Sequence, residues 1–376
     1  MHDTDTTHWL TLLSAAGIGA ATIRGLFEHF STIDQLFAAS DPALGKAGLT
    51  ARQLHALRNP DAERIDVARR WLEHERHEII TLRDTRYPNA LTDLPDAPVA
   101  LFANGDISLL ETPALAIVGS RNPTRGGADN ATQFAKFMAN RGLVIVSGLA
   151  TGVDAAAHSG ALDCDGATIA VLGNGPDQCY PPGNRALQQR IAEHGLILSE
   201  YLPGQPPSAS QFPARNRIIS GLALGVLVVE ATKRSGSLIT ARMAGEQGRS
   251  VFAIPGSIHN PLARGCHQLI RQGALLVEQA DDIFSEIGPR LSMILSATPA
   301  PAVATQNAAA AVADDDYSAV LDAMGWDPVS IDELVRRTAL TAAELSSMLL
   351  IMELEGRVEQ HPGGSFGRCR QQKVRS

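Results

Sequence analysis

The stretch that decides the fold is ALAIVGSRNPTRGG at residues 114–127, in which five consecutive apolar residues run directly into a glycine-rich turn. An apolar run without polar alternation is typical of a strand that is covered on both faces of a parallel sheet. The turn follows the carboxyl end of the expected strand, which is the edge where open α/β sheets bind ligands. The stretch therefore predicts a buried parallel strand that leads into a ligand-binding turn.

The same pattern repeats through residues 113–277. Six further apolar runs, separated mostly by stretches with helical spacing, predict strands at LVIVS (143–147), TIAVL (168–172), LILSE (196–200), GVLVVE (225–230), VFAIP (251–255) and ALLV (274–277). A repeated strand–helix order requires right-handed crossovers. The sequence therefore predicts an α/β fold with a doubly wound, mainly parallel sheet over residues 81–290.

Residues 1–80 are predicted to form a small helical domain of the SAM or helix-hairpin-helix kind, because apolar residues recur three and four positions apart. The expected helices are Trp9–Ala16, Ala20–Phe30, Ile33–Ala39, Thr50–Leu57 and Ala62–His77. The segment AAGIGAATIRGLF (15–27) resembles a helix-hairpin-helix element, whose turn amides can hold a backbone phosphate. A plain glycine turn in a helical bundle explains this segment equally well.

The C-terminal part begins with residues 291–313, which carry no charge and are rich in Ala, Pro, Thr and Ser. This composition predicts a linker. Behind it, a strand–turn–strand pattern is preceded by three helical patterns, at residues 317–324, 331–337 and 342–355. Three helices followed by a β-hairpin predict a winged-helix domain over residues 314–368.

The composition narrows the class of protein. The chain has 376 residues, with 32 Lys and Arg against 40 Asp and Glu and a formal net charge of −8 at pH 7. It contains no run near the roughly 18 apolar residues that a membrane helix needs, and its first residues lack signal-peptide features. We therefore expect a cytoplasmic protein without a membrane span. The four cysteines are scattered without a CxxC pair, so we expect no disulfide framework, metal site or cofactor.

The basic residues are unevenly distributed along the chain. Residues 206–277 contain eight Lys or Arg against two Glu, a local charge of 8 − 2 = +6. This excess is compatible with a polyanionic ligand despite the acidic total. An ordinary solvated surface is the competing interpretation.

The turns after the first two strands carry candidate site residues. In the first turn, Gly119 permits a sharp bend, Ser120 offers a hydroxyl and Arg121 can meet an anion. The chain contains no GxxxxGK[ST] motif, so nucleotide hydrolysis by a P-loop is not predicted. The second turn opens with Ser147 and Gly148.

Two ionisable residues follow the second turn, in the stretch GVDAAAHSGAL. Asp154 is predicted to be the N-cap of the next helix. His158 is interpreted as a structural histidine rather than a general base, because the sequence provides no partner for it. Neither residue is therefore counted as catalytic.

The densest constellation lies in residues 212–249. Its members are Phe212, Arg215, Asn216, Arg217, Ser235, Gly236 and Ser237. The two serines and the glycine precede a predicted helix, where free amides and hydroxyls make a phosphate cradle that needs no metal. The arginines can supply charge, and the phenylalanine ring can stack on a base.

Glu230 and Glu246 lie in the same region and raise the question of an acid/base pair. Separate glutamates without a nearby nucleophile favour salt-bridge or surface roles, so we predict no catalytic residue.

Taken in order, the motifs are highly specific. Over residues 113–284 the sequence closely resembles the DNA-processing protein A family (DprA, also called Smf), in the motifs AIVGSR, VSGLATGVDAAAHSGAL, VLGNGPDQCYPPGNRAL, LSEYLPG, FPARNRIISGL, VVEATKRSGSLITARMAGEQGR, VFAIPGS and GCHQLIRQGALLV. The flanking segments are similar to the family's optional domains. The resemblance implies an extended Rossmann-like domain that forms a homodimer and binds single-stranded DNA. It also implies that the protein protects incoming DNA in natural transformation and loads RecA recombinase, on strands already covered by single-strand-binding protein.

The resemblance also assigns the DNA-binding site. The family's residues map onto Gly119, Ser120, Arg121, Ser147, Gly148, Phe212, Arg215, Asn216, Arg217, Ser235, Gly236 and Ser237. Thr151 departs from the pattern, because many members carry Arg after SGLA, and the lost charge puts a DNA contact at this position in doubt.

Two other functions compete with DNA binding. The strand-then-glycine turns are also similar to those of lysine-decarboxylase-like nucleotide phosphoribohydrolases, but the matching turn reads SGSLITARMAGEQ instead of their PGGxGTxxE. A protein–protein adaptor with a vestigial pocket is the third interpretation.

Overall fold

The computed structural model describes residues 3–297 and parts of 320–368. It divides into two compact units, Met1–Thr298 and Pro299–Ser376, which are described separately. The first unit contains a nine-stranded sheet in the order β1-β2-β6-β5-β4-β3-β7-β8-β9. Every neighbouring pair from β6 to β9 is parallel, whereas β1 and β2 are antiparallel to their neighbours.

All seven strands expected from the apolar runs are present, with ends that differ by one or two residues at most. These seven are β3 (Ala114–Val118), β4 (Val144–Ser147), β5 (Thr168–Leu172), β6 (Leu196–Ser199), β7 (Gly225–Val228), β8 (Ser250–Ala253) and β9 (Leu275–Leu276). Two further strands, β1 (His77–Thr81) and β2 (Ala100–Gly105), complete the sheet. The predicted α/β class and mainly parallel sheet are therefore confirmed.

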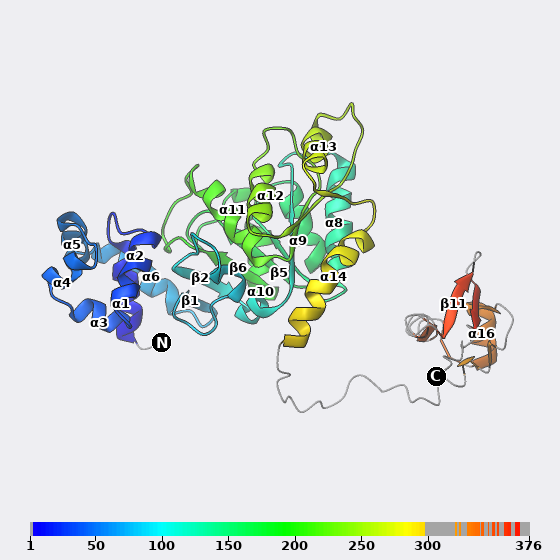
Figure 1. Cartoon of the computed structure of the whole chain (residues 1–376), viewed down its shortest axis with the longest axis horizontal. Coiled ribbons are helices and arrows are strands. Elements are labelled where there is room, and N and C mark those ends of the chain that lie inside the picture. Colours follow the sequence, from blue (N-terminus) through cyan, green and yellow to red (C-terminus); the bar gives the residue numbers. More distant parts are fainter. Residues whose placement is uncertain are drawn as a thin grey trace, which may run out of the picture. The chain divides into compact units, whose positions relative to one another are not determined.

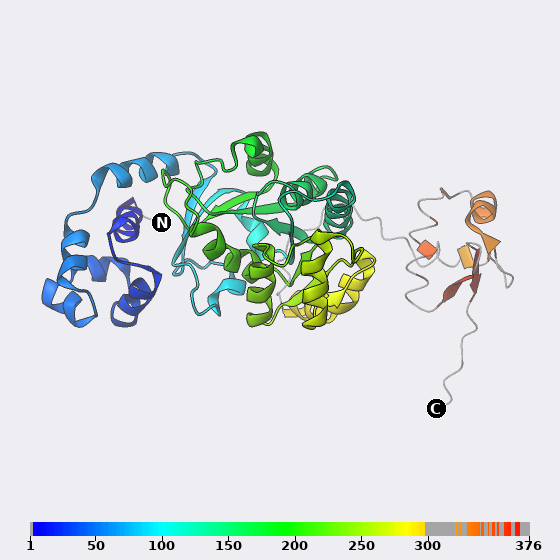
Figure 2. The ribbon, with the colours of Figure 1, turned by 90° about the horizontal axis from the view of Figure 1, so that it is seen from above.

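Helices cover both faces of this sheet (Figure 1, Figure 2). They are α7 (Asn89–Thr92), α8 (Arg125–Ala139), α9 (Val153–Leu162), α10 (Arg185–His194), α11 (Gln211–Leu222), α12 (Ser237–Glu246), α13 (Arg264–Arg271) and α14 (Ala280–Ala297). Ala116 of β3 shares a core with residues of α11 and α12, whereas its neighbour Leu115 shares another with residues of α8 and α9. Alternate residues of a strand face opposite sides, so an unbroken apolar run is what a doubly covered strand requires.

The strands β1 and β2 were not expected. The structure ends α6 (Ala62–Leu72) before the predicted end at His77, and His77 begins β1 instead. Ile79 of β1 pairs opposite Phe102 of β2, a long-range contact that the local helical spacing of residues 62–77 does not encode. The predicted boundary at residue 80 thus lies inside a strand.

The N-terminal helices pack on a core of their own. They are α1 (Asp3–Ser14), α2 (Ala20–His29), α3 (Ile33–Ala38), α4 (Asp41–Lys46), α5 (Ala51–Arg58) and α6. Trp9, Leu26 and Leu36 are buried there, and Phe102 of β2 belongs to the same core. Thr50 and Gln53 form a capping box at the start of α5, because a threonine at the N-cap and a glutamine three residues later can each bond the backbone amide of the other.

In the second unit the structure describes the second expected helix and the β-hairpin of the winged-helix pattern, whereas the expected helices at 317–324 and 342–355 lie partly outside the described residues. Helix α16 (Ile331–Thr338) follows strand β10 (Val329–Ser330), and a hairpin follows from β11 (Val358–His361) and β12 (Ser365–Arg368). Leu334 and Phe366 are buried in its core. Residues 291–297 of the expected linker continue helix α14, and residues 298–313 lie outside the described residues. Over the described parts of both units, no helix has the length and apolar character needed to cross a bilayer.

Candidate nucleic-acid interface

The main pocket is a cavity of about 710 Å³ where the turns after β3, β4 and β7 meet. Strands β4 and β7 flank β3 on opposite sides, so the pocket lies where the strand order reverses, the usual ligand position in such sheets. Nine of the expected site residues line it: Gly119, Ser120, Arg121, Phe212, Arg215, Asn216, Ser235, Gly236 and Ser237. The remaining three, Ser147, Gly148 and Arg217, do not.

The turn after β3 is held close to its neighbours. A Cβ at Gly119 would lie 2.8 Å from Cγ2 of Val153, so only glycine fits there without displacement. Arg121 is exposed on the pocket wall and has no ion-pair partner within residues 3–297. Its guanidinium is therefore free to meet an anion from solution.

The two glutamates have structural roles, as expected. Glu230 accepts hydrogen bonds from the amide (2.8 Å) and hydroxyl (2.7 Å) of Thr124, which caps α8. Glu246 pairs with Arg242 at 3.6 Å, with both side chains mostly exposed. Glu246 is also absent from the lining of the main pocket, which disfavours a phosphoribohydrolase active site.

The turn after β4 is strained and closed by Asp154. Gly152 has a φ of 80° and is the N-cap of α9, so the prediction that Asp154 is the N-cap is wrong. Asp154 instead accepts hydrogen bonds from the amides of Gly148 (3.1 Å) and Ala150 (3.3 Å), because it lies inside the first helical turn and faces back to the loop. Leu149 between them has a φ of 56°, a conformation that a non-glycine residue keeps only where its surroundings enforce it.

Two predicted residues beside this turn are buried in the core. Ser147 donates its hydroxyl hydrogen bond to the carbonyl of Ile117 at 2.7 Å, so its side chain faces the sheet and not the pocket. His158 contacts the Thr168 hydroxyl at 2.7 Å, and burial lowers its pKa to about 3. His158 is therefore a neutral core residue at physiological pH, in agreement with the structural interpretation.

Arg215 forms a buried cation under the pocket. It is 5% exposed, and its Nη1 donates to the carbonyls of Gly148 (2.8 Å) and Val171. A Cβ at Gly148 would lie 2.4 Å from this guanidinium, which explains the glycine. Burial lowers the pKa of Arg215 to about 10, partly offset by Asp154, so the side chain remains charged at neutral pH.

Arg217 does not share this position. Its guanidinium binds the carboxylates of Glu200 at 2.7 Å and Asp96 at 3.0 Å. Residues two apart on a helix are separated by about 200° around its axis, so Arg215 and Arg217 cannot face the same pocket. The expectation that both arginines face one groove is therefore wrong for Arg217.

The serine cradle, Ser235-Gly236-Ser237, lies at the start of α12, and some of its polar groups hydrogen-bond to one another. The hydroxyls of Ser235 and Ser237 lie 2.7 Å apart, and the amide of Leu238 donates to the Ser235 carbonyl. Gly236 is the N-cap and offers no side chain to close the turn. The cradle therefore presents hydroxyls and the helix end more than free amides.

An aromatic pair borders the pocket, and sequence reasoning found only half of it. The ring centroids of Phe212 and Tyr180 lie 5.1 Å apart at an interplanar angle of 34°. A Cβ at Gly173 would lie 2.8 Å from the Phe212 ring, so this glycine makes room for it. Tyr180 is 41% exposed. Its place after the third predicted strand, in GNGPDQCYPPGN, was the available signal.

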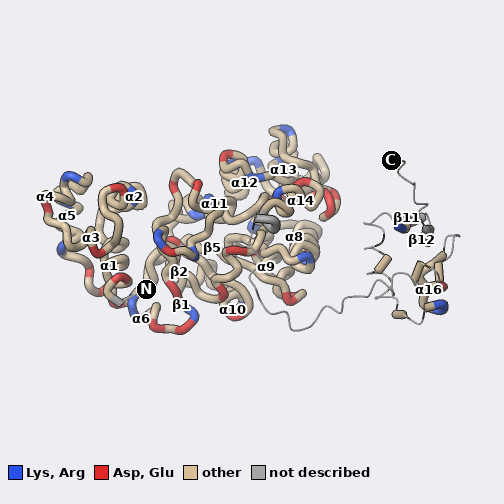
Figure 3. The backbone as a smooth tube through the Cα atoms, turned by 60° about the horizontal axis from the view of Figure 1, so that its bottom comes forward, with Lys and Arg blue, Asp and Glu red and all other residues tan. Residues whose placement is uncertain are grey.

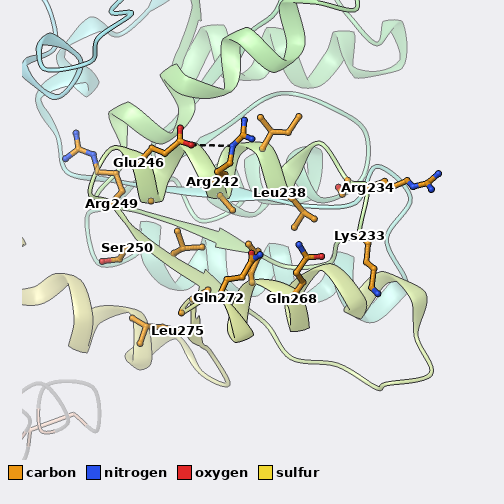
Figure 4. A pocket seen from close by; sticks show the side chains of 18 of the residues that line it. Lys233, Arg234, Leu238, Arg242, Glu246, Arg249, Ser250, Gln268, Gln272 and Leu275 are labelled. Carbon is orange, nitrogen blue, oxygen red and sulfur yellow. Dashed lines mark ion pairs between the residues drawn. The ribbon is translucent and has the colours of Figure 1, made fainter.

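A second cavity, the basic groove, continues past the cradle (Figure 4). It measures about 920 Å³, and its charged lining residues are Lys233, Arg234, Arg242, Arg249, Glu246 and Glu286, a charge of 4 − 2 = +2. Ser235 and Ile239 line both this groove and the main pocket, so the two cavities adjoin at the start of α12. Along the coloured part of the backbone tube, Lys and Arg are interspersed with Asp and Glu (Figure 3), so the excess is local.

No cluster of three His, Cys, Asp or Glu residues suited to a metal ion is found among the described residues. The cations that could balance a bound anion in the main pocket are thus the two arginines, Arg121 and Arg215.

Comparison with family models places both units. The model described as DNA recombination-mediator protein A matches residues 78–288, and that of the DprA winged helix domain matches residues 300–364. Among curated relatives, DNA processing protein DprA of Streptococcus pneumoniae is 43% identical over 75% of this chain and 98% of its own. Protein Smf of Escherichia coli is 37% identical over 96% of this chain and 95% of its own.

Solved structures agree with these matches. The X-ray structure of DprA from Streptococcus pneumoniae superposes with a TM-score of 0.67 at 41% identity, covering 74% of this chain and 97% of that one. The structure of DNA processing protein A from Helicobacter pylori, described for the single-stranded DNA binding mode of that protein, superposes with a TM-score of 0.52 at 33% identity, covering 57% and 97%. The chain therefore belongs to the DNA-processing protein A family, DprA/Smf.

Proposed function

We propose that the main pocket binds the backbone of single-stranded DNA with little sequence preference. The observation that carries this proposal is that the unpaired cation of Arg121 and the buried cation of Arg215 line one pocket, which is bordered by two aromatic rings. Cations that meet phosphates, with rings on which any base can stack, are the features of sequence-tolerant single-strand binding. The single-stranded DNA binding mode described for the Helicobacter pylori relative supports the same ligand class.

The strand would continue from the main pocket into the basic groove. The two cavities share Ser235 and Ile239, so a chain leaving the serine cradle meets Lys233 and Arg234 next. A polymer several nucleotides long fits this arrangement better than a single nucleotide does, which favours DNA over a nucleoside monophosphate.

The wider role that we propose rests on family membership. In the cytoplasm, a homodimer would present two such pockets, protect incoming strands and load RecA onto them during natural transformation. Binding two sites on one strand raises the effective concentration of the recruited partner without covalent chemistry. We propose no catalytic activity, and a RecA strand-exchange assay on DNA coated with single-strand-binding protein tests the loading step.

Fluorescence anisotropy with a labelled single strand tests the site itself. Arg121→Ala should weaken binding by about 1.5–3 kcal/mol, the range for a hydrogen bond to a charged group. Arg64→Ala, which removes an exposed arginine from α6, is the matched control and should leave the affinity unchanged. Affinity should also fall steeply with salt. Equal affinity for duplex DNA, or an unaffected Arg121→Ala variant, would contradict the proposed site.

A further inference from the structure

A loop that we call the strap, residues 201–210 between β6 and α11, connects the N-terminal helices with the main pocket. Its later residues form part of the pocket wall through Pro207, Ser208 and Ala209. Near its start, Leu202 is 5% exposed and belongs to the core of the N-terminal helices. The position of this wall therefore depends on the helices as well as on the sheet.

Helix α6 lies against the middle of the strap. Gly204 has a φ of 83°, a conformation that favours glycine. A Cβ at this position would lie 3.0 Å from Cγ1 of Val67 in α6, closer than an ordinary contact. The strap backbone and α6 thus touch, and a side chain at position 204 would push them apart.

The strap is also bonded to the loop after β5, which carries Tyr180. The amide of Gly204 donates to Oδ1 of Asp177 at 2.8 Å, and the amide of Gly175 donates to the carbonyl of Gln205 at 2.9 Å. Asp177 comes three residues before Tyr180, whose ring borders the main pocket. The two hydrogen bonds therefore hold two parts of the pocket wall in one arrangement.

Leu202 and Asp177 can act on a strand in this site only through the wall. Neither residue lines the main pocket or the basic groove, and the carboxylate of Asp177 would repel a phosphate. The affinity of a site falls in proportion to the fraction of molecules that hold the binding-competent arrangement. Anchors that keep the strap in place therefore raise the affinity without touching the ligand.

We propose that the N-terminal helices position the wall of the DNA site, with Leu202 and Asp177 as positioning residues. The proposal rests on single-stranded DNA binding by the main pocket and adds a way to regulate it. Displacement of α6 from the strap would loosen the wall and release the strand, although the helices themselves need not contact DNA.

Two substitutions of Asp177 test the hydrogen bond from Gly204. Asp177→Ala and Asp177→Asn both remove the negative charge, but only asparagine keeps a side-chain oxygen that accepts from the Gly204 amide. Fluorescence anisotropy with a labelled single strand of about 12 nucleotides, within the usual site size of such grooves, measures the affinity. We expect Asp177→Ala to bind about fivefold more weakly than Asp177→Asn, the change in an equilibrium constant that one ordinary hydrogen bond provides.

A pair of leucine substitutions tests the contribution of the N-terminal helices. Leu202→Ala and Leu36→Ala remove the same kind of buried side chain from the same core, but Leu36 lies in α3 and outside the strap. Both variants should lose stability. Only Leu202→Ala should also lose affinity, by about threefold or more, because a larger share of its molecules would hold the strap in an incompetent arrangement.

Circular dichroism establishes that each variant is folded before its affinity is compared. Equal affinities of Asp177→Ala and Asp177→Asn would overturn the proposal, and so would equal affinities of Leu202→Ala and Leu36→Ala. If Leu202→Ala does not fold, the exposed position of Asp177 still allows its two variants to decide the question. Such equalities refute this inference alone if the wild-type protein binds the strand and Arg121→Ala weakens binding. A wild-type protein that does not bind the strand refutes the proposed function together with the inference.

Discussion

Replacing Arg215 with alanine tests the buried cation under the main pocket. The side chain is 5% exposed and donates to the carbonyls of Gly148 and Val171. Burial raises the pKa of Asp154, and the positive charge of Arg215 opposes that rise. The substitution therefore deprives two carbonyls of their donor and one buried carboxylate of its compensating charge.

The expected loss follows from these contacts. Leaving a buried polar group without its partner costs about 1–3 kcal/mol, and removing one partner of a buried charge pair costs about 3–5 kcal/mol. The two costs overlap, because both arise from the loss of the same guanidinium. They are also partly offset, because the variant no longer has to bury a charged arginine side chain. We expect the free energy of unfolding to fall by about 3 kcal/mol at pH 7, on the same principles.

The pH dependence of this loss has a definite sign. A carboxyl group whose pKa is raised by folding adds stability below its unfolded pKa and loses it as the pH rises through the folded pKa. Without Arg215, the pKa of Asp154 should rise further, because burial is then opposed only by hydrogen bonds such as those from the Gly148 and Ala150 amides. The stability deficit of the variant should therefore shrink as the pH falls from 7 toward about 4, the usual range of an aspartate.

Urea denaturation followed by circular dichroism measures both effects. Arg215→Ala combined with Asp154→Asn is the matched control, because a neutral amide oxygen can still accept from the Gly148 and Ala150 amides. The double variant should be more stable than Arg215→Ala alone. A single variant within about 1 kcal/mol of wild type, far below the cost of an uncompensated buried charge, would refute the reasoning.

Three further outcomes are expected. Arg217→Ala should destabilise the fold, because Glu200 loses a partner at 2.7 Å, yet the folded variant should bind single strands with wild-type affinity in anisotropy. His158→Gln should reduce the loss of stability on acidification. Burial lowers the pKa of His158 to about 3, so the stability that this residue contributes is present above about pH 6.5 and is lost as the pH falls toward 3. Urea titrations at several pH values measure this loss. Replacing Lys233 and Arg234 together with alanine should lower the slope of log affinity against log salt by about two, one for each lost phosphate contact, while Arg64→Ala leaves the slope unchanged.

The central sheet was predictable because its strands are covered on both faces, so that each of them is a continuous apolar run in the sequence. ALAIV and TIAVL are buried at every position and match β3 and β5 residue for residue. The antiparallel strands β1 and β2 escaped prediction because their pairing joins residues more than twenty positions apart along most of its length. Local spacing in residues 62–77 fits a helix, and only the partner strand decides otherwise.

The site was predictable at the level of turns but not of individual side chains. Glycine-rich turns after apolar strands correctly indicated where the pocket lies. The direction of each side chain depends on helical phase and on long-range partners, as Arg217 shows through Glu200. Asp154 was misassigned because a residue two positions after the N-cap can reach back to the preceding loop. Tyr180 enters the site from the loop after β5, and its place after that strand indicates the pocket edge but not the contact with Phe212.

The pairing of β1 with β2 has a consequence for how the first unit can be divided. Phe102 belongs to the core of the N-terminal helices although its strand lies in the sheet. A fragment beginning at residue 81 would therefore lose the neighbour of β2 and present an unsatisfied, apolar edge to other molecules, the situation that leads to edge-to-edge aggregation. Strand β1 thus protects the edge of β2, and a chain shortened by proteolysis or recombination would have to keep β1 to remain dispersed.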